Sequence, residues 1–184
     1  MYANMAQEAL LISENAVKEM TGISDNVAGQ YLRPSIREAQ ERRLRSVLGQ
    51  ALTSKLKDMV AGRTIADAGN VRYKALLDEA QYFLAYASVA ELIPRVSYKV
   101  ANAGAVKTPD EKVENAGWDE VFNLRDHYTH KADAYCRDLQ RWVLDRRADY
   151  PELTENDCHE IRSQLYSAAS CGIWLGGPRG KRAF

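Results

Sequence analysis

The sequence is poor in the features that mark secreted, membrane-spanning or metal-binding proteins. It holds only three cysteines, Cys136, Cys158 and Cys171, and no two of them form a Cys-x-x-Cys pair. Disulfide frameworks use even numbers of cysteines and structural zinc sites use close pairs, so we expect reduced thiols and no zinc. No stretch approaches the roughly 20 apolar residues that cross a bilayer, and the first residues lack the basic-then-apolar order of a secretory signal. These absences predict a chain made in a cytoplasm, with no membrane partner.

An excess of charge of one sign is also missing. The sequence has 25 Lys and Arg against 25 Asp and Glu, so the formal net charge is zero. Non-specific binding to nucleic acid depends on excess Lys and Arg, and the composition therefore argues against a general polyanion binder. Apolar residues make up 46% and charged residues 27%, a balance typical of a globular protein with a buried core.

Motifs of catalysis and of nucleotide binding are absent as well. The sequence contains no Gly-x-Ser-x-Gly, no Walker loop and no Gly-x-Gly-x-x-Gly. His127 and His130 have the spacing to share a metal, with Asp126 and Asp133 nearby, but position 124 is Leu where a di-iron bundle needs Glu. We therefore predict no catalytic, metal-binding or cofactor-binding residues. A metal-dependent helical enzyme that uses the two histidines is the third-ranked function.

The periodicity of the apolar residues predicts a mainly α-helical protein, a bundle of five to six helices. Residues 71–93 are expected to form one helix, and residues 80–93 of it are apolar on nearly every side, which is typical of a helix at the centre of a bundle. Pro94 is expected to stop this helix. A second long helix is expected from Trp118 to about Ala148, with Phe122 among the residues of its apolar side.

Capping and breaking residues predict where the other helices begin and end. Ser13 caps a short first helix, and Gly22 stops it. Pro34 is expected in a first helical turn, where its missing N–H costs nothing, and Gly49 ends or bends the helix that follows. Thr154 caps the last helix. The inward face of that helix is expected to hold Cys158, Ile161, Leu165 and Tyr166.

Two segments depart from the helical pattern. Residues 95–108 alternate apolar with polar or small residues, which predicts an inserted β-hairpin or extended arm. The helical periodicity ends near residue 169, so we expect residues 1–169 to form the helical domain and residues 170–184 an extended C-terminal tail. An apolar group between glycines, followed by basic residues, is typical of a tail that docks either on its own core or on another chain.

We predict that both segments are protein interfaces. An isolated two-stranded hairpin is marginal in water, so the arm needs packing from elsewhere, and Trp and Arg often anchor interfaces. The predicted interface residues are Tyr98, Lys99, Val100 and Val106 in the arm, and Ile173, Trp174, Leu175, Pro178, Arg179, Lys181 and Arg182 in the tail.

One helix carries the strongest basic run of the chain. Its members are Arg33, Arg37, Arg42, Arg43 and Arg45, interrupted by Glu38 and Glu41. Mixed charges of this kind favour a salt-bridged face exposed to solvent. A DNA contact and a subunit interface are the alternatives, and the first of these predicts a small DNA-binding or packaging accessory protein that uses residues 33–45.

Several strings of residues resemble a known family. They are Leu11-Ile12-Ser13-Glu14, Thr21-Gly22-Ile23-Ser24-Asp25-Asn26, the run from Tyr31 to Gln40, Leu48-Gly49-Gln50-Ala51-Leu52, the run from Tyr98 to Val106, and the run from Gly172 to Lys181. In these strings the chain resembles the small head–tail connector proteins encoded by phages and prophages of Bacteroides-type gut bacteria, including crAss-like phages.

The resemblance implies a structural virion protein rather than an enzyme. It implies a helical bundle with extended arms that forms a ring, usually of twelve copies, in the virion neck after assembly in the host cytoplasm. The implied partners are further copies of the chain, the portal protein and the next neck or tail ring protein. DNA would pass through the ring without being read, and no cofactor is implied.

Overall fold

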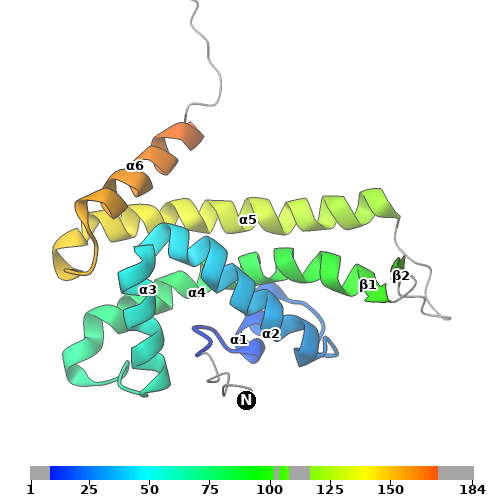
Figure 1. Cartoon of the computed structure of the whole chain (residues 1–184), viewed down its shortest axis with the longest axis horizontal. Coiled ribbons are helices and arrows are strands. Elements are labelled where there is room, and N and C mark those ends of the chain that lie inside the picture. The colour runs from blue at the N-terminus through cyan, green and yellow to red at the C-terminus, as the bar shows by residue number, and fades with distance from the viewer. Residues whose placement is uncertain (1–8, 102–103, 108–116, 170–184) are drawn as a thin grey trace, which may run out of the picture.

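The computed structural model describes residues 9–101, 104–107 and 117–169. These residues are mainly helical, as Figure 1 shows, and the predicted helical bundle is confirmed. The elements, in chain order, are α1 (Glu14–Thr21), α2 (Gly29–Glu38), the π-helical segment η1 (Ala39–Leu44), α3 (Arg45–Ala61), α4 (Val71–Ser97), β1 (Tyr98–Ala101), β2 (Gly104–Lys107), α5 (Trp118–Asp145) and α6 (Glu155–Ala169). Short 3₁₀ turns precede α4 and follow α5.

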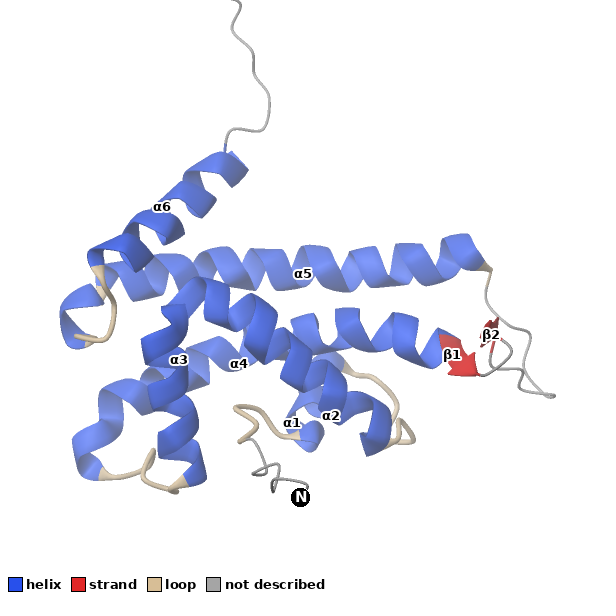
Figure 2. Cartoon of the chain, in the orientation of Figure 1, coloured by secondary structure: helices blue, strands red, loops and turns tan. Residues whose placement is uncertain are grey.

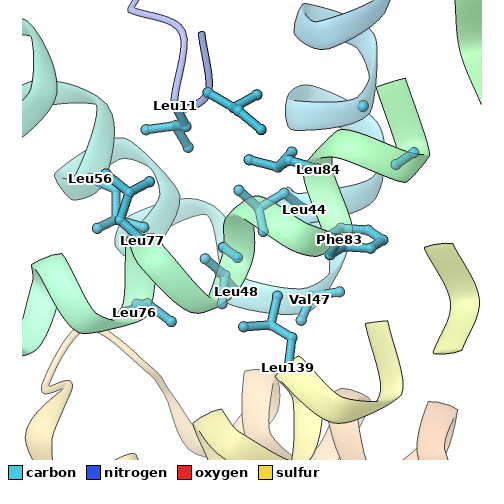
Figure 3. Close-up of a cluster of buried hydrophobic side chains, with 14 of the residues drawn as sticks. Leu11, Leu44, Val47, Leu48, Leu56, Leu76, Leu77, Phe83, Leu84 and Leu139 are labelled. Carbon is cyan, nitrogen blue, oxygen red and sulfur yellow. The ribbon is translucent and has the colours of Figure 1, made fainter. Parts of the chain in front are cut away.

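Helix α4 lies at the centre of the bundle, as the sequence predicts. It packs against α1, α2, η1 and α5. Every residue from Phe83 to Ile93 is buried except Tyr86 and Glu91, which are half-buried. Figure 3 shows Phe83 and Leu84 in a cluster of apolar side chains from α4 itself and from other elements. Those labelled there are Leu11, Leu44, Val47, Leu48, Leu56, Leu76, Leu77 and Leu139.

The π-helical segment η1 anchors the start of the described chain. Gln40 is fully buried, and a buried amide needs hydrogen-bond partners. Its Oε1 accepts from the Leu11 backbone N–H at 2.9 Å, and its Nε2 donates to the Ala9 carbonyl at 3.1 Å. The Gln40 amide thus makes the two hydrogen bonds to residues 9 and 11 that a neighbouring strand would otherwise make. Leu11 and Ile12 are buried.

Two prolines lie inside helices, contrary to the predictions. Helix α4 continues through Pro94 to Ser97, so the expected stop at Pro94 is wrong. Pro34 lies inside α2, which begins at Gly29, so its expected place in a first turn is also wrong. An internal proline costs about 3 kcal/mol or more. Each one adjoins buried residues of its own helix, Ile36 and Ile93 among them, and their burial offsets that cost.

Glycine and serine set two helix boundaries as predicted. The Ser13 hydroxyl accepts the N–H of Ala16 at 3.1 Å at the start of α1, and Gly22 ends the helix with φ 68°. Gly49 bends α3, with φ 74° and ψ 167°. A Cβ at Gly49 would lie 2.7 Å from Oδ1 of Asp157 in the first turn of α6. The absence of a side chain at Gly49 therefore allows both the bend in α3 and the close approach of α6.

Helix α6 confirms its predicted inward face in part. Cys158 and Ile161 are buried, and Leu165 packs against the core. Tyr166 is 73% exposed, so its expected inward position is wrong. Successive residues of a helix are turned by about 100°, so a side chain directly after Leu165 leaves the core-facing stripe.

A short strand pair lies between α4 and α5, drawn in red in Figure 2. Strands β1 and β2 are antiparallel, with Lys99 opposite Val106 and Ala101 opposite Gly104. These residues fall within the segment for which the sequence predicts an arm. The tail, residues 170–184, lies outside the described residues, so its predicted role stays a prediction.

The first prediction tests the central helix. Truncating a buried Phe or Leu to Ala removes apolar contacts and leaves a cavity, so Phe83→Ala and Leu84→Ala should each lower the free energy of unfolding by about 2–5 kcal/mol. Lys74→Ala is the control, because Lys74 forms only an exposed ion pair with Asp78 within α4. Its cost should stay near 0.5 kcal/mol or less. Denaturant unfolding measures all three, and parent-like values for both core variants would contradict the central position of α4.

The second prediction concerns the bend in α3. Gly49→Ala places a Cβ in a backbone region that is nearly exclusive to glycine and against the Asp157 carboxylate, and should cost about 1–3 kcal/mol. Gly69→Ala is the matched control, because nothing lies within 4 Å of its added Cβ. Thermal unfolding should separate the two variants clearly. Equal melting temperatures would show that the bend at Gly49 imposes no constraint.

Candidate protein interface

An exposed aromatic pair marks the N-terminal end of α5. Trp118 and Phe122 are four residues apart and therefore share a helix face. Their rings stack with centroids 5.8 Å apart and planes 20° apart. Trp118 is nevertheless 53% exposed and Phe122 46% exposed. The Arg125 guanidinium lies 5.9 Å from the centre of the Phe122 ring, within cation–π range. We refer to Trp118, Phe122 and Arg125 as the α5 patch.

The patch is exposed because it lies beside the stripe that α5 turns toward α4. That stripe includes Ala132, Leu139 and Val143, which are buried. On a helical wheel Phe122 is turned about 100° from Val121, which packs against the core. The expectation that Phe122 belongs to the covered apolar side of this helix is therefore wrong. A large aromatic group left in solvent is a common sign of a protein contact.

The outer edge of the patch is acidic. Phe122 has Asp119 three residues before it and Asp126 four residues after it, so both carboxylates border its ring on the helix surface. Asp126 also pairs with Arg125 at 3.6 Å, which neutralises that cation locally. Glu120 accepts the N–H of Gly117 at 2.8 Å. The helix dipole stabilises Asp119 and Glu120, which lie in the first turn of α5.

The strand pair lies at the same end of the molecule as the α5 patch (Figure 1). Strand β1 holds Tyr98, Lys99 and Val100 of the predicted interface, and β2 holds Val106. Val96, in the last turn of α4, is 38% exposed beside them. The structure thus gathers the arm residues at one end of the α4–α5 pair. It adds Trp118 and Phe122, which the sequence-based prediction of the interface did not include.

Four tyrosines hold α4 and α5 together behind the patch. The Tyr135 ring stacks on Tyr82 and on Tyr86, with centroids 5.6 and 5.2 Å apart, and Tyr128 lies 6.1 Å from Tyr86. The Lys131 ammonium lies 5.3 Å from the Tyr86 ring centre. Burial raises the pKa of the Tyr128 hydroxyl above its ordinary value. This stack fixes the two helices relative to each other, so the patch is presented by a rigid support.

Comparison with known proteins gives a family without an activity. Residues 44–163 match the model of the Family of unknown function (DUF6712). The chain belongs to this family. No curated protein and no solved structure matches it. The matched segment of this DUF6712 chain contains α3, α4, α5, the α5 patch and the tyrosine stack.

The basic run of the DUF6712 chain is largely paired with carboxylates. Arg33 pairs with Glu14, Arg42 with Glu38 at 2.7 Å, and Arg43 with Asp133 at 3.5 Å. Arg95 of α4 also reaches Glu38. Arg45 is exposed. These contacts agree with the salt-bridged interpretation, because Arg33, Arg42 and Arg43 have carboxylate partners within the chain.

The two histidines do not join a metal-binding cluster in the described part of the chain. His127 and His130 are exposed on α5, and the His127 ring meets the Tyr128 ring edge-on. Among the described residues, no three His, Cys, Asp or Glu side chains come together. Burial raises the pKa of the Cys136 thiol to about 11, so this cysteine stays protonated and is a poor nucleophile near neutral pH. Within residues 9–101, 104–107 and 117–169, no helix is long and apolar enough to cross a membrane.

The third prediction uses the pH dependence of Glu38. The hydrogen bonds from Arg42 and Arg95 hold the pKa of this carboxyl below its ordinary value. Since the folded pKa is depressed, the stabilisation is present above the unfolded pKa and is lost as the pH falls through the folded pKa. Glu38→Gln should therefore be less stable than the parent at neutral pH, by about 1 kcal/mol or less for so exposed a pair. The difference should vanish in acid.

Glu19→Gln is the control, because the exposed Glu19 side chain of α1 forms no hydrogen bond or ion pair with the residues that the structure describes. Urea unfolding at several pH values measures the difference between each variant and the parent. A Glu38→Gln difference that is constant from neutral pH into acid would contradict the proposed stabilisation.

Proposed function

We propose that this DUF6712 chain is a structural subunit of a phage virion neck, a head–tail connector that closes into a ring between the portal and the next tail component. The observation that carries the proposal is the α5 patch. Two large stacked rings stand half exposed on a helix that the tyrosine stack holds rigid. Aromatic side chains in such positions commonly anchor protein contacts. The virion context comes from the resemblance to head–tail connectors.

The proposed mechanism is assembly. A rigid α4–α5 pair suits a wedge-shaped subunit whose two sides meet different faces of its neighbours. Such head-to-tail contacts close into a ring when the rotation between copies divides a full turn, and the resemblance implies twelve copies. The α5 patch and the β1–β2 arm lie at one end of the molecule, where they would meet the next subunit, the portal protein or the next ring of the neck. DNA passes through the ring unread.

The alternative, a small DNA-binding or packaging accessory protein, would use the arginines of residues 33–45. The pairing of Arg33, Arg42 and Arg43 with carboxylates reduces the positive charge available to phosphates. A protein that neutralises several phosphates loses affinity steeply as salt rises. Binding of duplex DNA over a salt series therefore separates this function from assembly.

The fourth prediction places the chain in particles. Mass spectrometry of purified phage particles should find it with the portal protein, and a reconstruction of the neck should show it as a ring. Particles made with Trp118→Ala and Phe122→Ala together should lose most of the ring, because hot-spot truncations weaken an interface by about 2 kcal/mol or more each. Leu124→Ala is the matched control, since Leu124 is 51% exposed on the other flank of α5. Absence of the chain from particles would refute the connector role.

A further inference from the structure

We infer that residues 9–12 form a strap that opens as a unit while the rest of the bundle stays folded, and that the Gln40 amide is the contact that keeps the strap closed. The inference concerns a motion of the folded chain and does not depend on the proposed function. It is carried by the hydrogen bonds of the strap, by the burial of its side chains and by the cleft beside it.

The backbone of the strap is held by one side chain. The Leu11 N–H donates to Gln40 Oε1 at 2.9 Å, and Gln40 Nε2 donates to the Ala9 carbonyl at 3.1 Å. Within the described part of the chain, residues 9–12 form no other hydrogen bond. A strand in a sheet is held by a ladder of many backbone hydrogen bonds, whereas the strap loses both of its own when the contact with Gln40 breaks.

Two apolar side chains oppose the opening. Leu11 and Ile12 are 3% and 2% exposed, and Figure 3 shows Leu11 in the same cluster as Leu56 and Leu84. Burying two such side chains gains a free energy of the same order as the conformational entropy lost when a short backbone segment is fixed. Because these two terms nearly cancel, the two hydrogen bonds of Gln40 decide whether the strap stays closed.

The opening should end at Ser13, because α1 has attachments of its own. The Ser13 hydroxyl accepts the Ala16 N–H at 3.1 Å, and Val17 is fully buried. The Tyr86 hydroxyl of α4 donates to the Met20 carbonyl at 3.3 Å. The strap can therefore leave the core while α1 stays packed on α4.

A cleft beside the strap provides space for the motion. The cleft has a volume of about 630 Å³, and its lining includes Ala9, Leu10 and Ile12 of the strap and Arg33 of α2. Ala9 and Leu10 are only half-buried. The strap thus borders open space as well as the core, and it can move without displacing a helix. Segments with few hydrogen bonds are those that open locally before a protein unfolds.

Native-state hydrogen exchange of the full chain tests the opening. After correction for intrinsic rates, the Leu11 N–H should exchange at least about tenfold faster than the Leu84 N–H. Small additions of urea should leave the Leu11 rate unchanged, because opening the strap exposes little surface, and should raise the Leu84 rate. Equal protection and equal urea dependence of the two amides would show that the strap opens only when the whole bundle unfolds, and would overturn the inference.

Cleavage by thermolysin tests the role of Gln40. This protease cuts before large apolar residues in extended segments, so cleavage before Leu11 or Ile12 reports an open strap. Gln40→Met keeps the length of the side chain and removes both hydrogen bonds, and it should speed this cleavage at least about tenfold. Gln50→Met is the matched control, because Gln50 is an exposed amide of α3 that donates to Ser54 within the same helix. It should leave the cleavage rate unchanged.

Two results would overturn the role of Gln40. Cleavage of Gln40→Met at the rate of the parent would show that its hydrogen bonds do not hold the strap. Cleavage that rises equally within α4 would show that the substitution unfolds the bundle rather than the strap. If Gln40→Met does not fold, hydrogen exchange of the parent chain still decides whether the strap opens ahead of the bundle.

Discussion

A helix that is apolar on every side cannot face water, and α4 is such a helix from Phe83 to Ile93. Its stability depends on neighbours that cover it, because propensity alone does not hold an apolar helix in solution. Helices α1 and α2, the segment η1 and helix α5 supply that cover. Covering α4 on all sides fixes the arrangement of the bundle. The buried amide of Gln40 ties the described start of the chain to the same core.

The sequence predicted the parts of this fold that depend on local chemistry. Ser13 caps α1, Gly22 ends it and Gly49 bends α3, as predicted. These roles could be predicted because a helix cap or a positive φ depends mainly on the residue itself and its neighbours in the sequence. The predictions for Pro34 and Pro94 were wrong because tertiary burial outweighed a local penalty. The prediction for Tyr166 was wrong because periodicity shows how buried residues are spaced along α6 but does not show at which residue the buried face ends.

The candidate interface was harder to predict than the core. Trp118 and Phe122 have the same four-residue spacing as core residues, so nothing in the sequence alone distinguishes a covered aromatic pair from an uncovered one. Whether the pair is buried depends on how far α4 extends along α5 and on how α5 is rotated about its own axis. The tyrosine stack has a clearer signal, Tyr82 and Tyr86 on one helix and Tyr128 and Tyr135 on the other, but recognising it requires knowing that α4 and α5 are neighbours.

The π-helical segment η1 bears on how relatives of this chain can vary in length. A π turn holds one residue more than an α turn, and one residue corresponds to about 100° of rotation. Losing a single residue there would leave the helix continuous from α2 into α3 as far as the bend at Gly49, yet would turn α2 and Gln40 to a different face. The family match begins at Leu44, the last residue of η1. An insertion or deletion of one residue at this point would therefore rotate everything before η1 relative to the helix that follows it.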